Sequence, residues 1–143
     1  MVPAASDPSD IRSIAVSAED VVAAVETART SDREAVLRVT PPFSGRMRAR
    51  LHVRLDSEPA DTGTVHVDPE QLLTADAPAY PRPAETADRL RADSETAYTV
   101  ERHRKRHEKA VEEWRASLGD HIRDRVTLDT ATGSVAVDVY VLG

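Results

Sequence analysis

Cationic and apolar side chains alternate between residues 46 and 55. Because a β-strand has a period of two residues, the alternation predicts one strand with an apolar face and a cationic face. The apolar positions are Met47, Ala49, Leu51, Val53 and Leu55. The opposite positions, named the cationic row, are Arg46, Arg48, Arg50, His52 and Arg54. Such a row is suited to binding phosphates, since phosphate contacts dominate the affinity of proteins for nucleic acids.

The cationic row has an alternative interpretation. Sheet faces that bind single strands usually carry aromatic side chains for stacking, and the only aromatic residue nearby is Phe43, in the preceding turn. The arginines could instead pair with carboxylates of neighbouring strands, at about 0.2–1 kcal/mol for each pair. The candidate carboxylates are Asp56, Asp129 and Asp138. The row is therefore either a binding surface or an intramolecular salt-bridge face.

A second basic cluster, RHRKRH, covers residues 102–107. On a helix its charges disperse, because Glu101 lies four residues before Lys105 and Lys109 lies four before Glu113. This pattern is typical of a solvated helix face with weak ion pairs. Arg102 and Arg106 remain candidate binding residues, because the helix and the cationic row would form one surface if they lay side by side.

His103 and His107 are four residues apart, which is the spacing of a two-histidine metal pair on a helix. Residue 104 is arginine, so the glutamate of a HExxH motif is missing, and the surrounding cations disfavour a divalent ion. A third ligand would have to come from a distant acid or from another histidine, namely His52, His66 or His121. The pair also continues an apolar stripe, which indicates packing or a helix–helix contact. We therefore predict no metal and no cofactor.

Other catalytic motifs are weak. The chain has no GxSxG elbow around Ser44, no glycine-rich phosphate loop and no cysteine nucleophile. Asp61-Thr62-Gly63 matches the tripeptide of aspartic proteases but lacks their apolar flanks. An enzyme is not expected, and a small metal- or histidine-dependent enzyme is kept only as an alternative.

The elements that must position these residues follow from caps, periodicity and turn residues. We expect strands at 11–16, 34–39, 46–55, 64–67, 125–129 and 134–142, a helix from the Ser17 cap to residue 30, and a short helix at 69–74. Residues 84–118 contain neither glycine nor proline, yet one helix of that length would extend about 50 Å. A break is predicted at Asp93-Ser94, and Gly119 is predicted as the C′ glycine of the second helix.

This order predicts an α+β fold: a largely antiparallel sheet with one long helix in the C-terminal half and shorter helices packed on it. The stripe of the long helix contains Val100, His103, His107, Val111, Trp114 and Leu118. Residues 1–10 are expected to be a flexible N-terminus, and residues 11–143 a single α+β domain.

Composition indicates a habitat. The net charge is −6, and two of the 19 basic residues are lysine. Acid excess and scarce lysine resemble the proteins of salt-loving archaea, although a GC-rich genome would produce much of the same bias. The segments VLRVTPPFSGRMRARLHV, VHVDPEQLL and VAVDVYVLG together resemble a small uncharacterised haloarchaeal protein family of unknown function. That resemblance carries no catalytic motif.

No apolar run approaches the roughly 18 residues of a membrane span, and the first residues lack the basic and apolar regions of a signal peptide. We expect a cytoplasmic protein that does not contact a membrane. The leading hypothesis is a non-catalytic module whose cationic row binds an acidic partner, either a nucleic acid or a protein. The alternative is a homodimeric assembly protein that associates through the long helix or the edge of the C-terminal hairpin.

Overall fold

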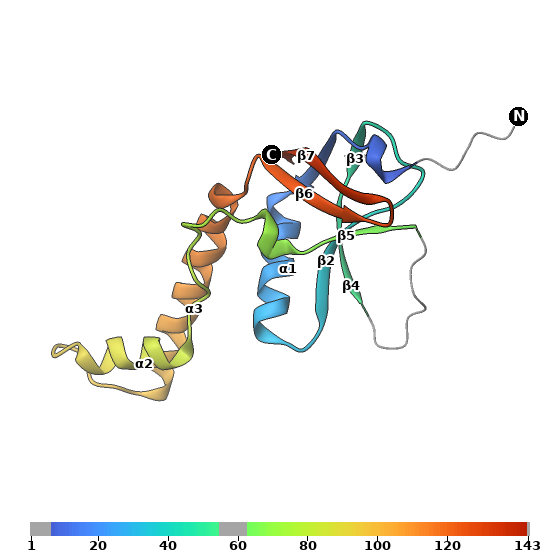
Figure 1. Cartoon of the computed structure of the whole chain (residues 1–143). Coiled ribbons are helices and arrows are strands. Elements are labelled where there is room, and N and C mark those ends of the chain that lie inside the picture. Colours follow the sequence, from blue (N-terminus) through green and yellow to red (C-terminus); the bar gives the residue numbers. More distant parts are fainter. Residues whose placement is uncertain (1–6, 55–62, 143) are drawn as a thin grey trace, which may run out of the picture.

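The computed structural model of the chain describes residues 7–54 and 63–142 (Figure 1). Its strands are β1 (Ser13–Ser17), β2 (Glu34–Val39), β3 (Arg46–Arg48), β4 (Arg50–Arg54), β5 (Val65–Val67), β6 (Arg125–Thr130) and β7 (Gly133–Leu142). Its α-helices are α1 (Ala18–Thr30), α2 (Pro83–Ala92) and α3 (Val100–Leu118). Short 3-10 helices are η1 (Pro8–Asp10), η2 (Pro69–Leu72) and η3 (Gly119–His121). The predicted α+β class is confirmed.

The strands form two sheets. One has the order β3-β1-β7-β6 and the other the order β4-β2-β5. The pairs β2–β4 and β6–β7 are antiparallel, as expected for strands joined by short connections, and β2–β5 is antiparallel as well. By contrast, β1 runs parallel to both of its neighbours, β3 and β7. Parallel partners cannot be joined by a tight turn, so these two pairings leave no local signal in the sequence.

The prediction of a single strand over 46–55 is wrong, because the chain changes sheets at Ala49. The backbone N–H of Ala49 donates to the carbonyl of Ala15 over 3.0 Å, and its side chain is completely buried. Before this residue β3 lies beside β1; after it β4 lies beside β2. The small side chain lets the backbone pass through the core, and the cationic row is divided between two sheets.

Helix α1 forms where the sequence predicts it. The Ser17 hydroxyl accepts from the backbone N–H of Asp20 over 3.1 Å, which caps the first turn. Val21, Ala24 and Val25 are buried in one core cluster with residues of both sheets. Because this apolar stripe faces the sheets, α1 covers the inner side of β2 and β4.

The second and third helices form an arm, residues 83–118, that extends away from the sheets (Figure 1). The predicted break is confirmed: α2 ends at Ala92, and α3 starts where the Thr99 hydroxyl accepts from the backbone N–H of Arg102. Trp114 and Leu118 belong to the main core, whereas Leu90 and Val111 are buried outside that cluster. Helix α2 packs on α3, so the outer part of the arm has a small core of its own.

The arm is joined to the rest of the molecule near Trp114. The indole N–H of Trp114 donates to the carbonyl of Pro78 over 3.0 Å, and the Tyr80 ring lies edge-on at 4.8 Å. Arg115 binds the Glu26 carboxylate of α1 with N–O distances of 2.6 and 2.7 Å. These hydrogen bonds lower the pKa of Glu26, while burial and the nearby Glu26 charge raise the pKa of Tyr80.

Gly119 was predicted as the C′ glycine, but it is the C-cap residue of α3. Its φ is −59°, and the chain continues directly into η3. The glycine is explained by a close approach instead, since an added Cβ would lie 3.3 Å from the Cβ of Ala18.

Candidate functional site

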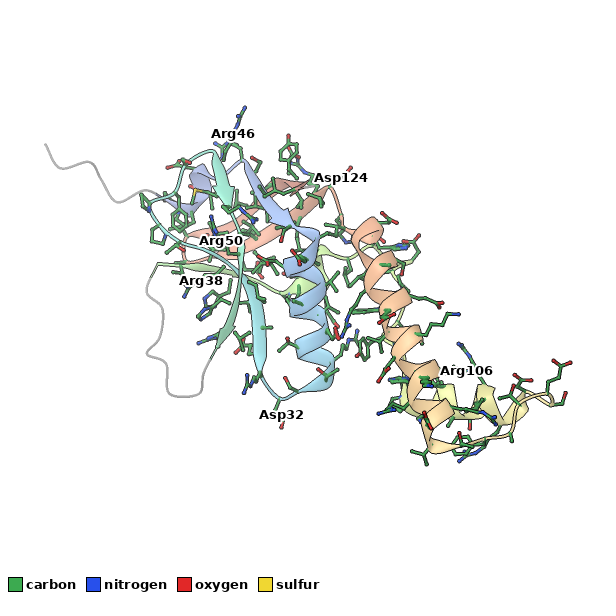
Figure 2. The ribbon with its side chains drawn as sticks, turned by 180° about the vertical axis from the view of Figure 1, so that it is seen from behind. Asp32, Arg38, Arg46, Arg50, Arg106 and Asp124 are labelled. Carbon is green, nitrogen blue, oxygen red and sulfur yellow. The ribbon has the colours of Figure 1, made fainter. Side chains whose placement is uncertain are left out.

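The outer face of the three-stranded sheet gathers basic side chains from all of its strands. Arg38 of β2 lies opposite Arg50 of β4 on one side and opposite His66 of β5 on the other. Alternate residues of β2, namely Ala35, Leu37 and Val39, are buried in the core, so Arg38 points outward. We name this surface the basic face: Arg38, Arg50, His52, Arg54 and His66. Figure 2 labels Arg38 and Arg50 on this sheet.

Two histidine rings lie at the centre of the basic face. The rings of His52 and His66 are stacked, with centroids 6.3 Å apart and an angle of 29° between their planes. The Thr64 hydroxyl lies 3.5 Å from Nε2 of His66. Both histidines are half-buried. The face thus combines cations with a pair of flat rings.

An acidic residue lies at one end of the face. Glu34 is opposite Arg54 in the antiparallel pair, and their side chains form an ion pair of 3.4 Å. A depression of about 550 Å³ begins beside Glu34 and His66 and extends to Asp68 and the end of α1. The basic face is therefore bordered by a cavity large enough for a small planar group.

The two N-terminal members of the cationic row lie elsewhere. Arg48 is half-buried, and its guanidinium donates to the carbonyls of Ala15 and Ala49 over 3.2 and 3.4 Å, which ties β3 to β1. Arg46 is exposed and lies opposite Ser13 in the four-stranded sheet. Only Arg50, His52 and Arg54 of the row belong to the basic face.

The predicted carboxylate partners also lie apart from the basic face. Asp138 pairs with Arg125 over 2.9 Å within the four-stranded sheet, and Asp129 accepts from the Ser134 hydroxyl. Asp56 lies outside the described residues, as do Asp61 and Thr62 of the protease-like tripeptide. On this face, Arg54 of the row forms an ion pair with Glu34 instead.

Sequence reasoning missed Arg38 and His66. Both were visible as outward positions of alternating strands, at 34–39 and 64–67. The register that brings them together could not be read from the sequence. In the chain, β3 and the change of sheet at Ala49 lie between β2 and its partner β4.

Arg102 and Arg106 of the arm do not extend this surface. Helix α1 contacts β2 and β4 and also contacts α3, and both views place it between the sheet and the arm (Figures 1 and 2). Arg102 donates to the carbonyl of Ala97 over 2.8 Å, and Arg106 lies 3.4 Å from Asp93. The helix and the row therefore present two separate basic surfaces.

The interpretation of His103 and His107 as a helix–helix contact is confirmed. His107 shares a hydrogen bond of 2.9 Å with the Thr86 hydroxyl of α2, and Nε2 of His103 lies 2.9 Å from the carbonyl of Pro83. These contacts join α3 to α2. Within the ranges 7–54 and 63–142 no group of three or more histidine or acidic residues is arranged to hold a metal ion.

No helix in the described parts of the chain is both long and apolar enough to cross a membrane. Searches among curated proteins and among solved structures found no match to this chain. A family described as a domain of unknown function (DUF8009) matches residues 1–143. The chain therefore belongs to the DUF8009 family over its whole length.

Proposed function

We propose that the protein is a non-catalytic module that binds single-stranded nucleic acid on the basic face. The observation that carries the proposal is the stacked pair His52 and His66, with Arg38, Arg50 and Arg54 on the same sheet face. Guanidinium groups contact phosphates, and histidine rings and guanidinium planes both stack on unpaired bases. Single strands expose both phosphates and base faces, whereas a duplex hides the faces of its bases.

An acidic protein surface would satisfy the arginines but would leave the ring pair without a role. Stacking on a base contributes about 1–3 kcal/mol, which is comparable to several exposed ion pairs. The acid-rich composition and the resemblance to haloarchaeal proteins support a high-salt habitat as part of this proposal. Molar salt screens the attraction of phosphates. The ring pair would then supply the part of the affinity that resists salt.

The test is fluorescence anisotropy with a labelled single-stranded RNA, the DNA of the same sequence and a duplex control. Titrations at about 0.1 M and 2 M KCl separate the salt-dependent part of the affinity from the stacking part. We expect binding of single strands that falls about tenfold in Arg50→Gln and in His52→Ala. Arg46→Gln is the matched control, because Arg46 belongs to the same stretch of chain but to the other sheet. Equal losses in Arg46→Gln and Arg50→Gln, or tighter binding of the duplex, would contradict the proposal.

A homodimer is a second candidate, favoured by apolar exposure at the end of β7. Tyr140, Val141 and Leu142 are 59%, 45% and 45% exposed. Tyr140 also borders a groove of about 450 Å³ with Arg46 and Met47 of β3. This Tyr140 face of β7 differs from the predicted helix stripe, because Val111, Trp114 and Leu118 of that stripe are buried within the monomer. Light scattering of the wild type and of Tyr140→Lys tests it; a wild-type monomer at all concentrations removes this candidate.

A further inference from the structure

The arm carries a second basic surface, a groove of about 320 Å³. It is lined by Leu90 of α2, Thr96 of the connection, and four cations of α3, namely Arg102, Lys105, Arg106 and Lys109. Lys105 and Arg106 lie three and four residues after Arg102 and four and three residues before Lys109, so the four cations share one face of the helix. We name this feature the arm groove.

The arm groove is cationic at its rim and apolar below. Leu90 is 1% exposed and closes the floor, while the long side chains of arginine and lysine contribute apolar stems beneath their charges. Two carboxylates neutralise part of the rim, since Arg106 lies 3.4 Å from Asp93 and Lys105 lies 3.5 Å from Glu101. The chemistry of the groove thus suits a ligand that has both an apolar group and several negative charges.

The position of the arm favours a docking role. Its outer part adds nothing to the main core, because Leu90 and Val111 are buried away from that cluster. At the same end of α3, Val100 is 78% exposed and Tyr98 is 37% exposed. Figure 2 shows Arg106 on the projecting helix, away from the sheets. A pair of helices held out in this way presents its surface to another molecule without disturbing the fold.

We propose that the arm groove docks an acidic amphipathic helix of a partner protein. Such a helix places an apolar side chain and carboxylates on one face, at spacings of three and four residues, and so matches both the floor and the rim. A nucleic acid would bring phosphates but no aliphatic group for the floor, and it would meet Glu101 and Asp93 beside the cations. This inference does not depend on the proposed function, because α1 separates the arm from the basic face.

The test uses the full chain and a labelled synthetic peptide of about 16 residues, made of glutamate with leucine at helical spacings of three and four. A polyglutamate peptide of equal length and a single-stranded oligonucleotide are the comparison probes. We expect the amphipathic peptide to bind at least about tenfold more tightly than polyglutamate, since only the former fills the apolar floor. Equal affinity of the two peptides, or displacement of the amphipathic peptide by the oligonucleotide, would overturn the proposal.

The variant that tests the groove is Lys105→Glu with Lys109→Glu. It reverses two rim charges and leaves in place the contacts of Arg102 and Arg106 with the connection between the helices. We expect peptide affinity to fall about tenfold or more. Arg104→Glu is the matched control, because Arg104 is an exposed residue of the same helix that does not line the groove. Its affinity should equal that of the wild type, and an equal loss in both variants would overturn the proposal.

Folding and specificity are checked on the same samples. Circular dichroism should show the helix content of the lysine variant unchanged, and if it is reduced, Lys109→Glu alone repeats the titration. Arg50→Gln should leave peptide binding unchanged while it weakens oligonucleotide binding. A protein that binds the oligonucleotide but not the amphipathic peptide would overturn only the arm proposal, and the converse result would overturn only the proposed function.

Discussion

Arg38 of β2 lies directly opposite Arg50 of β4, so two like charges face each other across an antiparallel pair. Like charges in that relation destabilise a sheet, whereas a single acidic residue at either position would stabilise it. Substitutions at this pair can therefore be followed by two independent measurements, the free energy of unfolding and the affinity for anions.

Replacing Arg50 by glutamine should weaken anion binding without a loss of stability. Removal of one like charge leaves the free energy of unfolding unchanged or raises it by up to about 0.5 kcal/mol at low salt. Urea denaturation in low and high KCl measures the effect, which salt should diminish. A loss of more than about 1 kcal/mol would mean that Arg50 stabilises the sheet through contacts other than this pairing.

Replacing Arg48 by alanine should have the opposite result. Its guanidinium donates to the carbonyls of Ala15 and Ala49, and the variant would leave both acceptors without this donor where the chain changes sheets. We expect a loss of about 1–2 kcal/mol in the free energy of unfolding, with oligonucleotide affinity unchanged once the protein is folded. Denaturation and anisotropy on the same preparation provide the check. Weaker binding at unchanged stability would place Arg48 with the binding residues instead.

The sequence predicts the elements of this fold better than their partners. Caps and periodicity locate α1, the break between α2 and α3, and the C-terminal hairpin, because each depends on neighbouring residues. The change of sheet at Ala49 depends on Ala15, which lies far away in the chain and accepts its N–H. The alternation of cationic and apolar residues continues through Ala49 without a break. The sequence therefore gives no sign of the change, because the two-residue period of a strand does not reveal which sheet the strand joins.

The candidate site shows the same limit. Arg50, His52 and Arg54 are visible as one run, but the face they form requires Arg38 and His66 from two other strands. The ring pair needs the register of both antiparallel pairings, and an error of one residue would turn either histidine to the other face. Stacking was therefore absent from the sequence prediction, and the arginines alone could not distinguish a nucleic acid from an acidic protein.

Protonation of Glu26 should loosen the arm. Hydrogen bonds from Arg115 hold the pKa of Glu26 below its ordinary value of 4.5 in the folded protein. A lowered folded pKa adds stability that is fully present above pH 4.5 and is lost as the pH falls through the folded pKa. We expect Glu26→Gln to be less stable than the wild type at neutral pH, with the difference disappearing in acid.

Thermal unfolding of both proteins over a series of pH values measures this difference. Glu34→Gln is a suitable control, because its ion pair with Arg54 is a surface contact away from the arm. A gap between wild type and Glu26→Gln that stays constant at acid pH would show that the variant acts through packing and not through the carboxylate charge.

Replacing Trp114 by phenylalanine should free the arm while keeping most of the core. The ring still packs beside Tyr80, but the carbonyl of Pro78 loses the indole N–H that binds it at 3.0 Å. We expect the free energy of unfolding to fall by about 1 kcal/mol, and the amides of α3 to exchange hydrogen faster relative to those of β7. Tyr98→Ala, at the far end of the arm, should leave β7 and overall stability unchanged. Equal acceleration in α3 and β7 would contradict this prediction, because it would show that the Trp114 contact acts only through the stability of the whole fold.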